Sequence, residues 1–323
     1  MKGHKLTAKS QRNIKVLRLF FISLIFVAIA AAIAIIGCNY IGNRNFKETF
    51  YSVSSLKVNN KIRLIQISDL HDCMYGKDND KLIDRVGKLK PDLIIYTGDI
   101  IDSDSESIDR AVNLCKELSS IAPSYYVYGN NEVERYYDIP LTQDALDEKF
   151  GFDDDSRESG KLLENTDELE EKLGEVGVKV LKNASDTIIV GATRIDVYGV
   201  LTSNPSSFWS YAGESFDEHI YSNENNLKIT AIHEPLVLSE YQPETWGDLV
   251  IAGDTHGGIV RIPIIGPLYT KEIGFLPESS GYYIYGRYEV QGRPLIVSSG
   301  LENKNIFRIN NSPELVIVDI NKF

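Results

Sequence analysis

Cysteine and histidine are scarce in this chain of 323 residues, which has three cysteines and five histidines. The cysteines are odd in number and widely spaced, which excludes a disulfide framework and a Cys-x-x-Cys zinc site. The sequence also lacks a glycine-rich nucleotide loop, a Gly-x-Ser-x-Gly elbow and internal repeats. Chemistry at cysteine, a serine nucleophile on such an elbow and a repeat architecture are therefore not expected.

Positive charge is scarce outside the N-terminus. The formal net charge is −12, although residues 1–38 contain six basic residues and no acidic one. Residues 39–323 therefore carry −18. Such an acidic body repels polyanions, so we expect no nucleic-acid polymer among its partners. With 43% apolar residues, the chain is long and apolar enough to build a well-buried globular core.

One long apolar run is present, from Leu19 to Gly37. As a helix, these 19 residues would extend about 28 Å, close to the roughly 30 Å hydrocarbon thickness of a bilayer. The sequence therefore predicts a transmembrane helix or signal anchor over 19–37, preceded by a basic cytoplasmic tail over 1–18. A juxtamembrane stretch over 38–58 and a domain over 59–323 follow. The basic tail predicts a single-pass protein of the cell membrane with this domain outside the cytoplasm.

A lipid anchor is the alternative to a membrane-spanning helix. Residues 35–38, Ile-Ile-Gly-Cys, resemble the lipobox of bacterial lipoproteins, in which the cysteine is acylated after cleavage. Cys38 would then carry the anchor. The apolar run is longer than the signal core of about 7–15 residues, which favours the uncleaved helix. Both alternatives tether the domain to a membrane.

Short β-branched runs alternate with amphipathic helical patterns along the domain. This alternation predicts an α/β fold with a mainly parallel sheet. The predicted strands cover residues 63–67, 92–96, 124–128, 227–232 and 248–252. The predicted helices cover residues 80–89, 107–119 and 166–174. An acidic segment over 138–171 is predicted to be a solvated insertion.

Each predicted strand runs into side chains that can bind a metal ion. In chain order, these are Asp69 with His71, Asp99, Asn130, His233, and Asp254 with His256. In open α/β sheets, ligands bind at the carboxyl ends of the strands, where successive loops converge. Three of the five histidines stand at these ends, and buried carboxylates in one cluster need cations. The sequence therefore predicts a metal centre.

Five short blocks carry a resemblance to a known family. They are Asp69-Leu-His71, Gly98-Asp99-Ile-Ile-Asp102, Gly129-Asn130-Asn131-Glu132, His233 and Gly253-Asp254-Thr-His256. In this order they resemble the D-x-H, G-D-x-x-D, G-N-H-D/E, H and G-H-x-H pattern of the calcineurin-like metallophosphoesterases, in particular the membrane-associated bacterial branch. The resemblance covers about residues 60–315. It implies a four-layer α/β/β/α sandwich with two mixed β-sheets.

The resemblance also implies a phosphoesterase that uses two divalent metal ions. The ligand set that it implies is Asp69, His71 and His256 on one ion, Asn130, His233 and Asp254 on the other, and Asp99 bridging both. In such a site two ions activate a hydroxide that attacks phosphorus in line, and they stabilise the attacking and leaving oxygens. Asp102 would orient a ligand or stabilise a loop.

Two positions depart from the family pattern. Asn131 replaces the histidine of G-N-H, and Asp254 replaces the first histidine of G-H-x-H. Asn131 can donate a hydrogen bond to the phosphoryl group but cannot deliver a proton. Asp254 remains a ligand, but it adds negative charge and a harder oxygen, which favours manganese or magnesium over zinc. We therefore expect diesters to be favoured over monoesters, and manganese to be favoured among Mn, Mg, Fe and Zn.

The sequence thus favours a membrane-anchored, divalent-metal-dependent phosphoesterase. Its phosphoester substrate stays open, with lipid-linked and cell-wall-derived phosphates among the alternatives. The competing interpretation is a catalytically impaired metal-binding module that uses the same pocket for recognition. Residues 261–288, rich in glycine, proline and tyrosine, are interpreted as ordinary loop packing. A loop over the metal site and a surface facing lipid headgroups are the alternatives for this segment.

Overall fold

The computed structural model describes most of the chain. The described residues are 8–137, 166–201, 223–235, 238, 247–262, 264–270, 273–304 and 308–323. Residues 138–165 of the acidic insertion predicted over 138–171 lie outside the described residues. The solvation of this insertion therefore stays a prediction.

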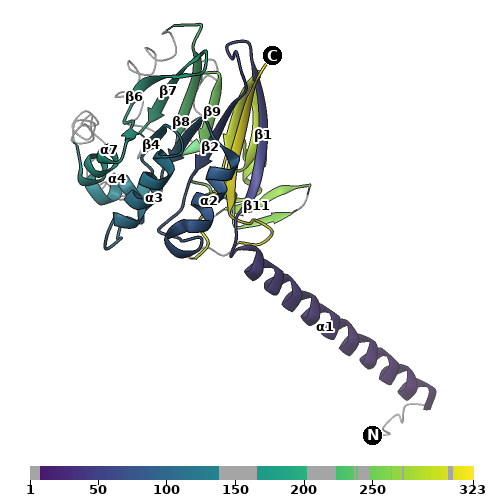
Figure 1. Cartoon of the computed structure of the whole chain (residues 1–323). Coiled ribbons are helices and arrows are strands. Elements are labelled where there is room, and N and C mark those ends of the chain that lie inside the picture. The colour runs from purple at the N-terminus through teal and green to yellow at the C-terminus, as the bar shows by residue number, and fades with distance from the viewer. Residues whose placement is uncertain are drawn as a thin grey trace, which may run out of the picture.

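Two six-stranded β-sheets form the centre of the domain (Figure 1). The first has the order β1 (Lys47–Ser55), β15 (Glu314–Lys322), β2 (Ile62–Ile67), β3 (Leu93–Thr97), β4 (Ser124–Val127), β5 (Val178–Val180). The second has the order β13 (Gly286–Val290), β14 (Arg293–Val297), β9 (Leu249–Ala252), β8 (Leu227–Ile232), β7 (Thr193–Val200), β6 (Ala184–Val190). Both sheets are mixed, because β15 is antiparallel to β2 and β6 is antiparallel to β7.

The helices that cover the first sheet are α2 (Asp80–Leu89), α3 (Asp109–Ser119) and α7 (Glu168–Glu175). The first of these matches its predicted bounds, and it buries Leu82, Val86 and Leu89 on one face, as the helical spacing predicts. The predictions over 107–119 and 166–174 were off by up to two residues at each end. A further short helix, α4 (Asn130–Tyr137), follows β4 directly and carries the block that begins at Asn130.

Side chains of the first sheet alternate between two apolar cores, as the period of two along a strand requires. Leu64 and Ile95 lie between the two sheets, whereas Ile65, Ile94 and Tyr96 pack against the helices. A third apolar cluster lies around β7, β8, β9 and β14 and does not include the helices described above. The structure therefore supports an α layer and two β layers. No helix of the described residues forms the predicted fourth layer, so that layer stays a prediction.

The longest helix, α1 (Ala8–Gly42), extends away from the domain (Figure 1). It contains the apolar run, and its described large apolar side chains are exposed. Among the described residues, however, no helix is long and apolar enough to cross a membrane. The predicted transmembrane helix is therefore not supported by this finding.

The direction of the strands decides where the candidate ligands lie. Strand β1 begins just after α1 and runs parallel to β15, and β15 runs antiparallel to β2. The carboxyl end of β2 therefore lies at the end of the domain where α1 joins it. Strands β3 and β4 are parallel to β2, so their carboxyl ends, and the ligands that follow them, lie at that same end.

The segment over 261–288 is more regular than the predicted loop. It contributes to a three-stranded antiparallel sheet of β10 (Val260–Ile262), β11 (Gly266–Thr270) and β12 (Gly274–Phe275). A short 3₁₀ turn, η4 (Pro277–Ser280), and the start of β13 follow. The glycine and proline residues of this segment lie partly in the short strands themselves, as Gly266 and Pro267 do in β11 and Gly274 does in β12, and partly in the 3₁₀ turn, as Pro277 does.

Candidate metal centre

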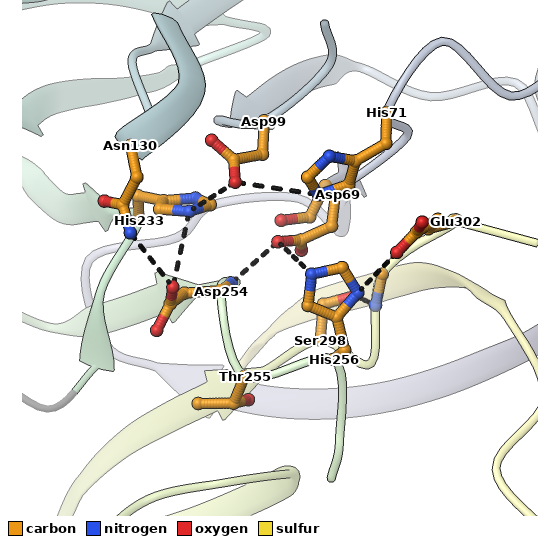
Figure 2. A network of polar contacts seen from close by, with 12 residues as sticks. Asp69, His71, Asp99, Asn130, His233, Asp254, Thr255, His256, Ser298 and Glu302 are labelled. Atoms are coloured by element: carbon orange, nitrogen blue, oxygen red, sulfur yellow. Dashed lines mark hydrogen bonds and ion pairs between the residues drawn. The ribbon is translucent and has the colours of Figure 1, made fainter. Parts of the chain in front are cut away.

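Five loops bring all seven predicted ligand residues into one cluster (Figure 2). His233 Nε2 lies 3.3 Å from Asp99 Oδ2 and 3.7 Å from Asp254 Oδ1. Asn130 Nδ2 lies 3.4 Å from the same Asp254 oxygen. His71 Nε2 lies 3.6 Å from Asp99 Oδ2. The histidines at the ends of β2 and β8 thus converge on the carboxylate of Asp99.

Two groups of three side chains in this cluster are close enough to hold a metal ion. The groups are Asp69 with His71 and His256, and Asp69 with Asp99 and His233, with ligand atoms within 4.8 Å of one another in each. The first group equals the set that the resemblance implies for one ion. In the second, Asp99 and His233 come together as expected. Asp69 belongs to both groups, although the resemblance assigned the bridging position to Asp99.

The loops reach this arrangement with unusual backbone geometry. Asp69, His71, Asp99, Asp254 and His256 all have φ between 47° and 69°, the left-handed region that side chains with a Cβ rarely adopt. Backbone hydrogen bonds hold two of the loops together, since the Asp69 N–H donates to the Gly98 carbonyl oxygen and the His71 N–H donates to the Asp99 carbonyl oxygen. Strain of this kind is typical of functional sites.

Glycine is required where the loops approach each other. A Cβ on Gly129 would lie 2.3 Å from Asp99 Oδ1, and a Cβ on Gly98 would lie 2.5 Å from the Gly129 nitrogen. Neither distance is sterically possible. The two glycines that precede Asp99 and Asn130 are therefore the condition for bringing the ends of β3 and β4 into contact.

All three histidines present Nε2 to the cluster, because a neighbour holds Nδ1 from behind. His71 Nδ1 lies 2.7 Å from Asp102 Oδ1, and His233 Nδ1 lies 2.6 Å from the Thr97 carbonyl oxygen. His256 Nδ1 lies 3.4 Å from Glu302 Oε2. Ligating histidines usually have such an acceptor at the second nitrogen, which fixes the tautomer with an open Nε2. The predicted orienting position of Asp102 agrees with this contact.

The residues present fit divalent metal ions. Four buried atoms of the cluster have no hydrogen-bond partner, namely Asp69 Oδ2, His71 Nε2, Asn130 Oδ1 and His233 Nε2. Buried polar atoms without partners are costly and rare, so this concentration requires a ligand. Oxygen and imidazole donors together suit divalent first-row metals. The unpaired atoms belong to residues at the ends of three strands, β2 and β4 of the first sheet and β8 of the second, so the cluster lies where the two sheets meet.

Charge in the cluster leads to the same conclusion. Burial raises the pKa of Asp69, and the nearby Asp99 carboxylate raises it further. Burial alone would lower the pKa of His233, but the carboxylates of Asp99, Asp69 and Asp254 outweigh it and raise that pKa well above its ordinary value. The protein thus concentrates buried negative charge around one histidine, and bound cations would compensate that charge.

Asn131 contacts Asp99, and its predicted contact with the phosphoryl group stays a prediction. Its Nδ2 donates to Asp99 Oδ2 at 2.7 Å, and its backbone N–H donates to Asp99 Oδ1 at 2.9 Å. Its Oδ1 accepts from the Ser103 N–H at 3.1 Å. Both ends of the amide are therefore used to hold Asp99 in place.

Glu132 is a residue of the site whose importance the sequence did not indicate. It is fully buried, and it accepts hydrogen bonds from the N–H groups of Asp99, Ile100 and Gly129 at 2.8–2.9 Å. The Tyr126 hydroxyl donates to the same carboxylate at 2.6 Å. One side chain thus joins the loops after β3 and β4. Its place in the block that ends at Glu132 was the available signal.

Glu302 and Arg308 were missed as well. Glu302 lies behind His256, and the buried guanidinium of Arg308 donates to the His256 carbonyl oxygen at 3.2 Å and to that of Ser299 at 2.7 Å. Arg308 Nη2 also lies 3.3 Å from His256 Nδ1. Both residues lie more than 40 positions from His256 in the sequence, and no motif joins them.

Comparisons with known proteins agree with this geometry. The family model for the calcineurin-like phosphoesterases matches residues 62–258, a range that contains every predicted ligand. The uncharacterized metallophosphoesterase YkuE of Bacillus subtilis is 24% identical over 269 residues, which cover 79% of this chain and 77% of that protein. The phosphodiesterase YaeI of Escherichia coli is 24% identical over 233 residues, which cover 72% of this chain and 71% of that protein.

A solved structure aligns over a similar part of the chain. The crystal structure of TT1561 of Thermus thermophilus covers 74% of this chain and 90% of that one, with a TM-score of 0.42 and 11% identity.

Replacement of Glu132 by glutamine should weaken both the fold and metal binding. An amide has one acceptor oxygen, and its NH₂ group would face backbone donors, leaving a buried N–H unpaired. We expect a loss of about 1–3 kcal/mol in the free energy of unfolding. Because Asp99 is then less well held, we also expect metal affinity to fall by about 10–100-fold. Denaturant unfolding and metal titration of the full chain in detergent measure both effects.

Glu134→Gln is the matched control, since Glu134 lies on the same helix, α4, and is not among the groups that hold Asp99. Its unfolding free energy and metal affinity should stay close to those of the unmodified chain. Equal behaviour of the two variants would show that the buried carboxylate is not needed to hold the loops.

Proposed function

The chain belongs to the calcineurin-like phosphoesterase family and is a metal-dependent phosphoesterase, and from this we propose that its seven clustered side chains bind two divalent metal ions for the hydrolysis. The single observation that carries the proposal is the set of four buried ligand-type atoms without hydrogen-bond partners at the ends of β2, β4 and β8. One ion needs fewer ligands than the seven that converge here.

We assign Asp69, His71 and His256 to one ion, Asn130, His233 and Asp254 to the other, and Asp99 to a position between them. When bound, two such ions lower the pKa of water, orient the phosphoryl group and stabilise the attacking and leaving oxygens. The Nε2 atoms of His71 and His233, which are buried without hydrogen-bond partners, support this assignment.

The protein's own contribution is to hold these ligands in place. Asp102, the Thr97 carbonyl and Glu302 fix the orientation of the three imidazoles, and Asn131 and Glu132 fix Asp99 and its loop. Preorganised ligands need no rearrangement during the reaction, which is the general source of catalysis by fixed charges. The family histidine at position 131 is absent, and the asparagine there is engaged with Asp99.

We further propose that the enzyme prefers diesters and that manganese is its favoured ion. Asp254 adds a negative charge to the donor set, so the site attracts a phosphate dianion less than a singly charged diester. Carboxylate oxygen favours manganese or magnesium relative to zinc. The name of the E. coli relative, a phosphodiesterase, is consistent with the diester preference.

Membrane anchoring and extracytoplasmic location are part of the proposal. The printed sequence has six basic residues before its 19-residue apolar run and none within that run. The run lies in α1, which projects from the domain with its described apolar side chains exposed. Acylation of Cys38 is the alternative anchor, and a lipid-linked or cell-wall phosphoester is the proposed substrate class.

Two metal ions per chain are expected after manganese loading, as measured by elemental analysis. His233→Ala should lose mainly one ion and His71→Ala mainly the other, because these side chains belong to different ligand groups. Asp99→Asn should reduce turnover of a generic phosphodiester by more than about 100-fold. Loss of a residue that only supports a metal ligand costs up to about 100-fold, and Asp99 is assigned as a ligand itself. Asp109→Asn, on the exposed start of α3, is the control. At most one ion in the unmodified chain would contradict the assignment.

The unmodified enzyme should turn over a diester with an activated leaving group faster than the matching monoester. Restoring histidine through Asn131→His with Asp254→His should raise monoester turnover more than diester turnover. The gain should be up to about tenfold for each 1.4 kcal/mol of recovered stabilisation. A preference for monoesters, or an equal change for both substrates, would refute the charge argument. Two bound ions without any turnover would favour the recognition module instead.

Protease added to intact cells should release a fragment of about the size of residues 39–323, because the basic tail holds the N-terminus inside. Immunoblotting of the cells with an antibody against the domain measures the release, and an internal cytoplasmic protein that stays intact is the control. Complete protection, in an envelope permeable to the protease, would refute the topology. Detection of an acylated Cys38 at the mature N-terminus would show that a lipid, and not a membrane-spanning helix, anchors the domain.

A further inference from the structure

Exposed apolar side chains gather on the small sheet of β10, β11 and β12. Ile264 is 107% exposed, Phe275 74%, Ile265 58% and Leu276 43%, and we call these four residues the hairpin tip. Elsewhere in the described residues beyond α1, exposed large apolar side chains are scattered singly along the chain, at Phe50, Leu56, Met74, Ile189 and Phe323. Scattered exposed apolar residues are ordinary, whereas a local group of four on one small element indicates a contact surface.

Two of the four residues of the hairpin tip, Ile264 and Leu276, have strained backbone geometry. The Ile265 N–H donates to the Ile262 carbonyl and closes a turn in which Ile264 has φ 76°. Leu276 has φ 49°. Glycine or asparagine is usual in this left-handed region, and a β-branched residue there is an outlier. A turn that places isoleucine in this conformation with its side chain in solvent violates two local preferences, which is typical of functional positions.

The hairpin tip belongs to the end of the domain where α1 and the metal centre lie. Lys47, at the start of β1, donates from Nζ to the Tyr285 hydroxyl at 2.7 Å, and the Arg261 guanidinium of β10 lies 3.4 Å from the centre of the Tyr285 ring. Asn43, just after α1, donates to the Arg308 carbonyl at 3.3 Å, and the Arg308 side chain contacts His256. Figure 1 shows the small sheet beside the junction of α1 with the domain.

We propose that the hairpin tip inserts into the headgroup region of the bilayer that holds α1, and that this contact keeps the metal centre facing the lipid surface. The proposal rests on the membrane anchoring proposed above. Arginine, lysine and tyrosine at the base of the small sheet suit the boundary between headgroups and water. Here these are Arg261, Lys47 and Tyr285.

A bilayer fits the hairpin tip better than a protein partner does. Specific protein interfaces bury roughly 800 Å² on each partner, with some 20–30 residues a side, and the tip offers four apolar side chains. A lipid surface needs no such area when the domain is already tethered beside it, because the tether makes the second contact intramolecular. A weak apolar insertion is then sufficient to orient the domain.

Depth measurements in vesicles test the proposal. The full chain carrying Cys38→Ser is reconstituted in vesicles of phosphatidylcholine and phosphatidylglycerol, and an environment-sensitive fluorophore is attached at Ile264→Cys or, separately, at Phe275→Cys. Cys73 and Cys115 are buried, and the parent without a new cysteine measures any background labelling. Lipids with nitroxide-labelled acyl chains serve as quenchers. We expect a blue-shifted emission and at least about twofold quenching at both positions, because inserted apolar side chains reach the acyl boundary.

Leu56→Cys is the matched control. Leu56 is 82% exposed and follows the end of β1, so it lies at the opposite end of the domain from α1. Its label should stay in water, without quenching.

Flotation of the chain with vesicles but no quenching at positions 264 and 275 would overturn the docking and leave the anchor intact. A chain that does not float with vesicles would overturn the anchor and the docking together. Energy transfer between labelled copies without lipid quenching would assign the tip to a second copy and also overturn the proposal. None of these outcomes depends on turnover, so the phosphoesterase assignment is tested separately.

Discussion

The whole structure depends on the burial of several carboxylates side by side. Asp69 and Asp99 are almost fully buried, and Asp254 approaches both His233 and Asn130 within 4 Å. Clustered carboxylates resist burial unless cations compensate their charge. Two divalent ions would provide that compensation. The strained left-handed loops and the close contacts at the glycines are needed to bring these ligand side chains together. Metal ions bound there would satisfy the ligand atoms that have no other partner.

A second layer of contacts makes this cluster rigid. Acceptors lie behind all three histidines, and the loop that carries Asp99 is tied to the next loop by Glu132. Asn131 changes the expected division of tasks. Where the family pattern has a histidine that can move a proton, this chain has an asparagine that holds Asp99 with two hydrogen bonds, one from its side-chain amide and one from its backbone N–H. Position 131 therefore positions Asp99 and cannot transfer a proton. This is consistent with the proposed substrate, whose leaving group departs without strong acid assistance.

Strand direction gives the domain a polarity that links the site to its surroundings. Since β15 is parallel to β1 and antiparallel to β2, the carboxyl ends that carry the ligands and the start of β1 share one end. Helix α1 joins the domain there, and the small sheet with its exposed apolar side chains lies beside that junction. If α1 anchors the domain as proposed, the enzyme would encounter its substrates at the membrane surface.

The sequence by itself determined the strand ends and the residue types on them. Short β-branched apolar runs predict β2, β3, β4, β8 and β9 to within one residue at each end. Such continuous runs are expected because strands of this kind are buried on both faces. The spacing of one βαβ unit between Asp69, Asp99 and Asn130 then predicts that their side chains meet. Only the tertiary structure decided the rest. It placed β15 between β1 and β2, and it brought Glu302 and Arg308 to His256. It also buried Glu132 between two loops and folded the short sheet of β10, β11 and β12. Each of these features joins residues far apart in the chain or depends on turns. Local patterns carry no information about such pairings, because their free energy comes from contacts that exist only after the two sheets have come together.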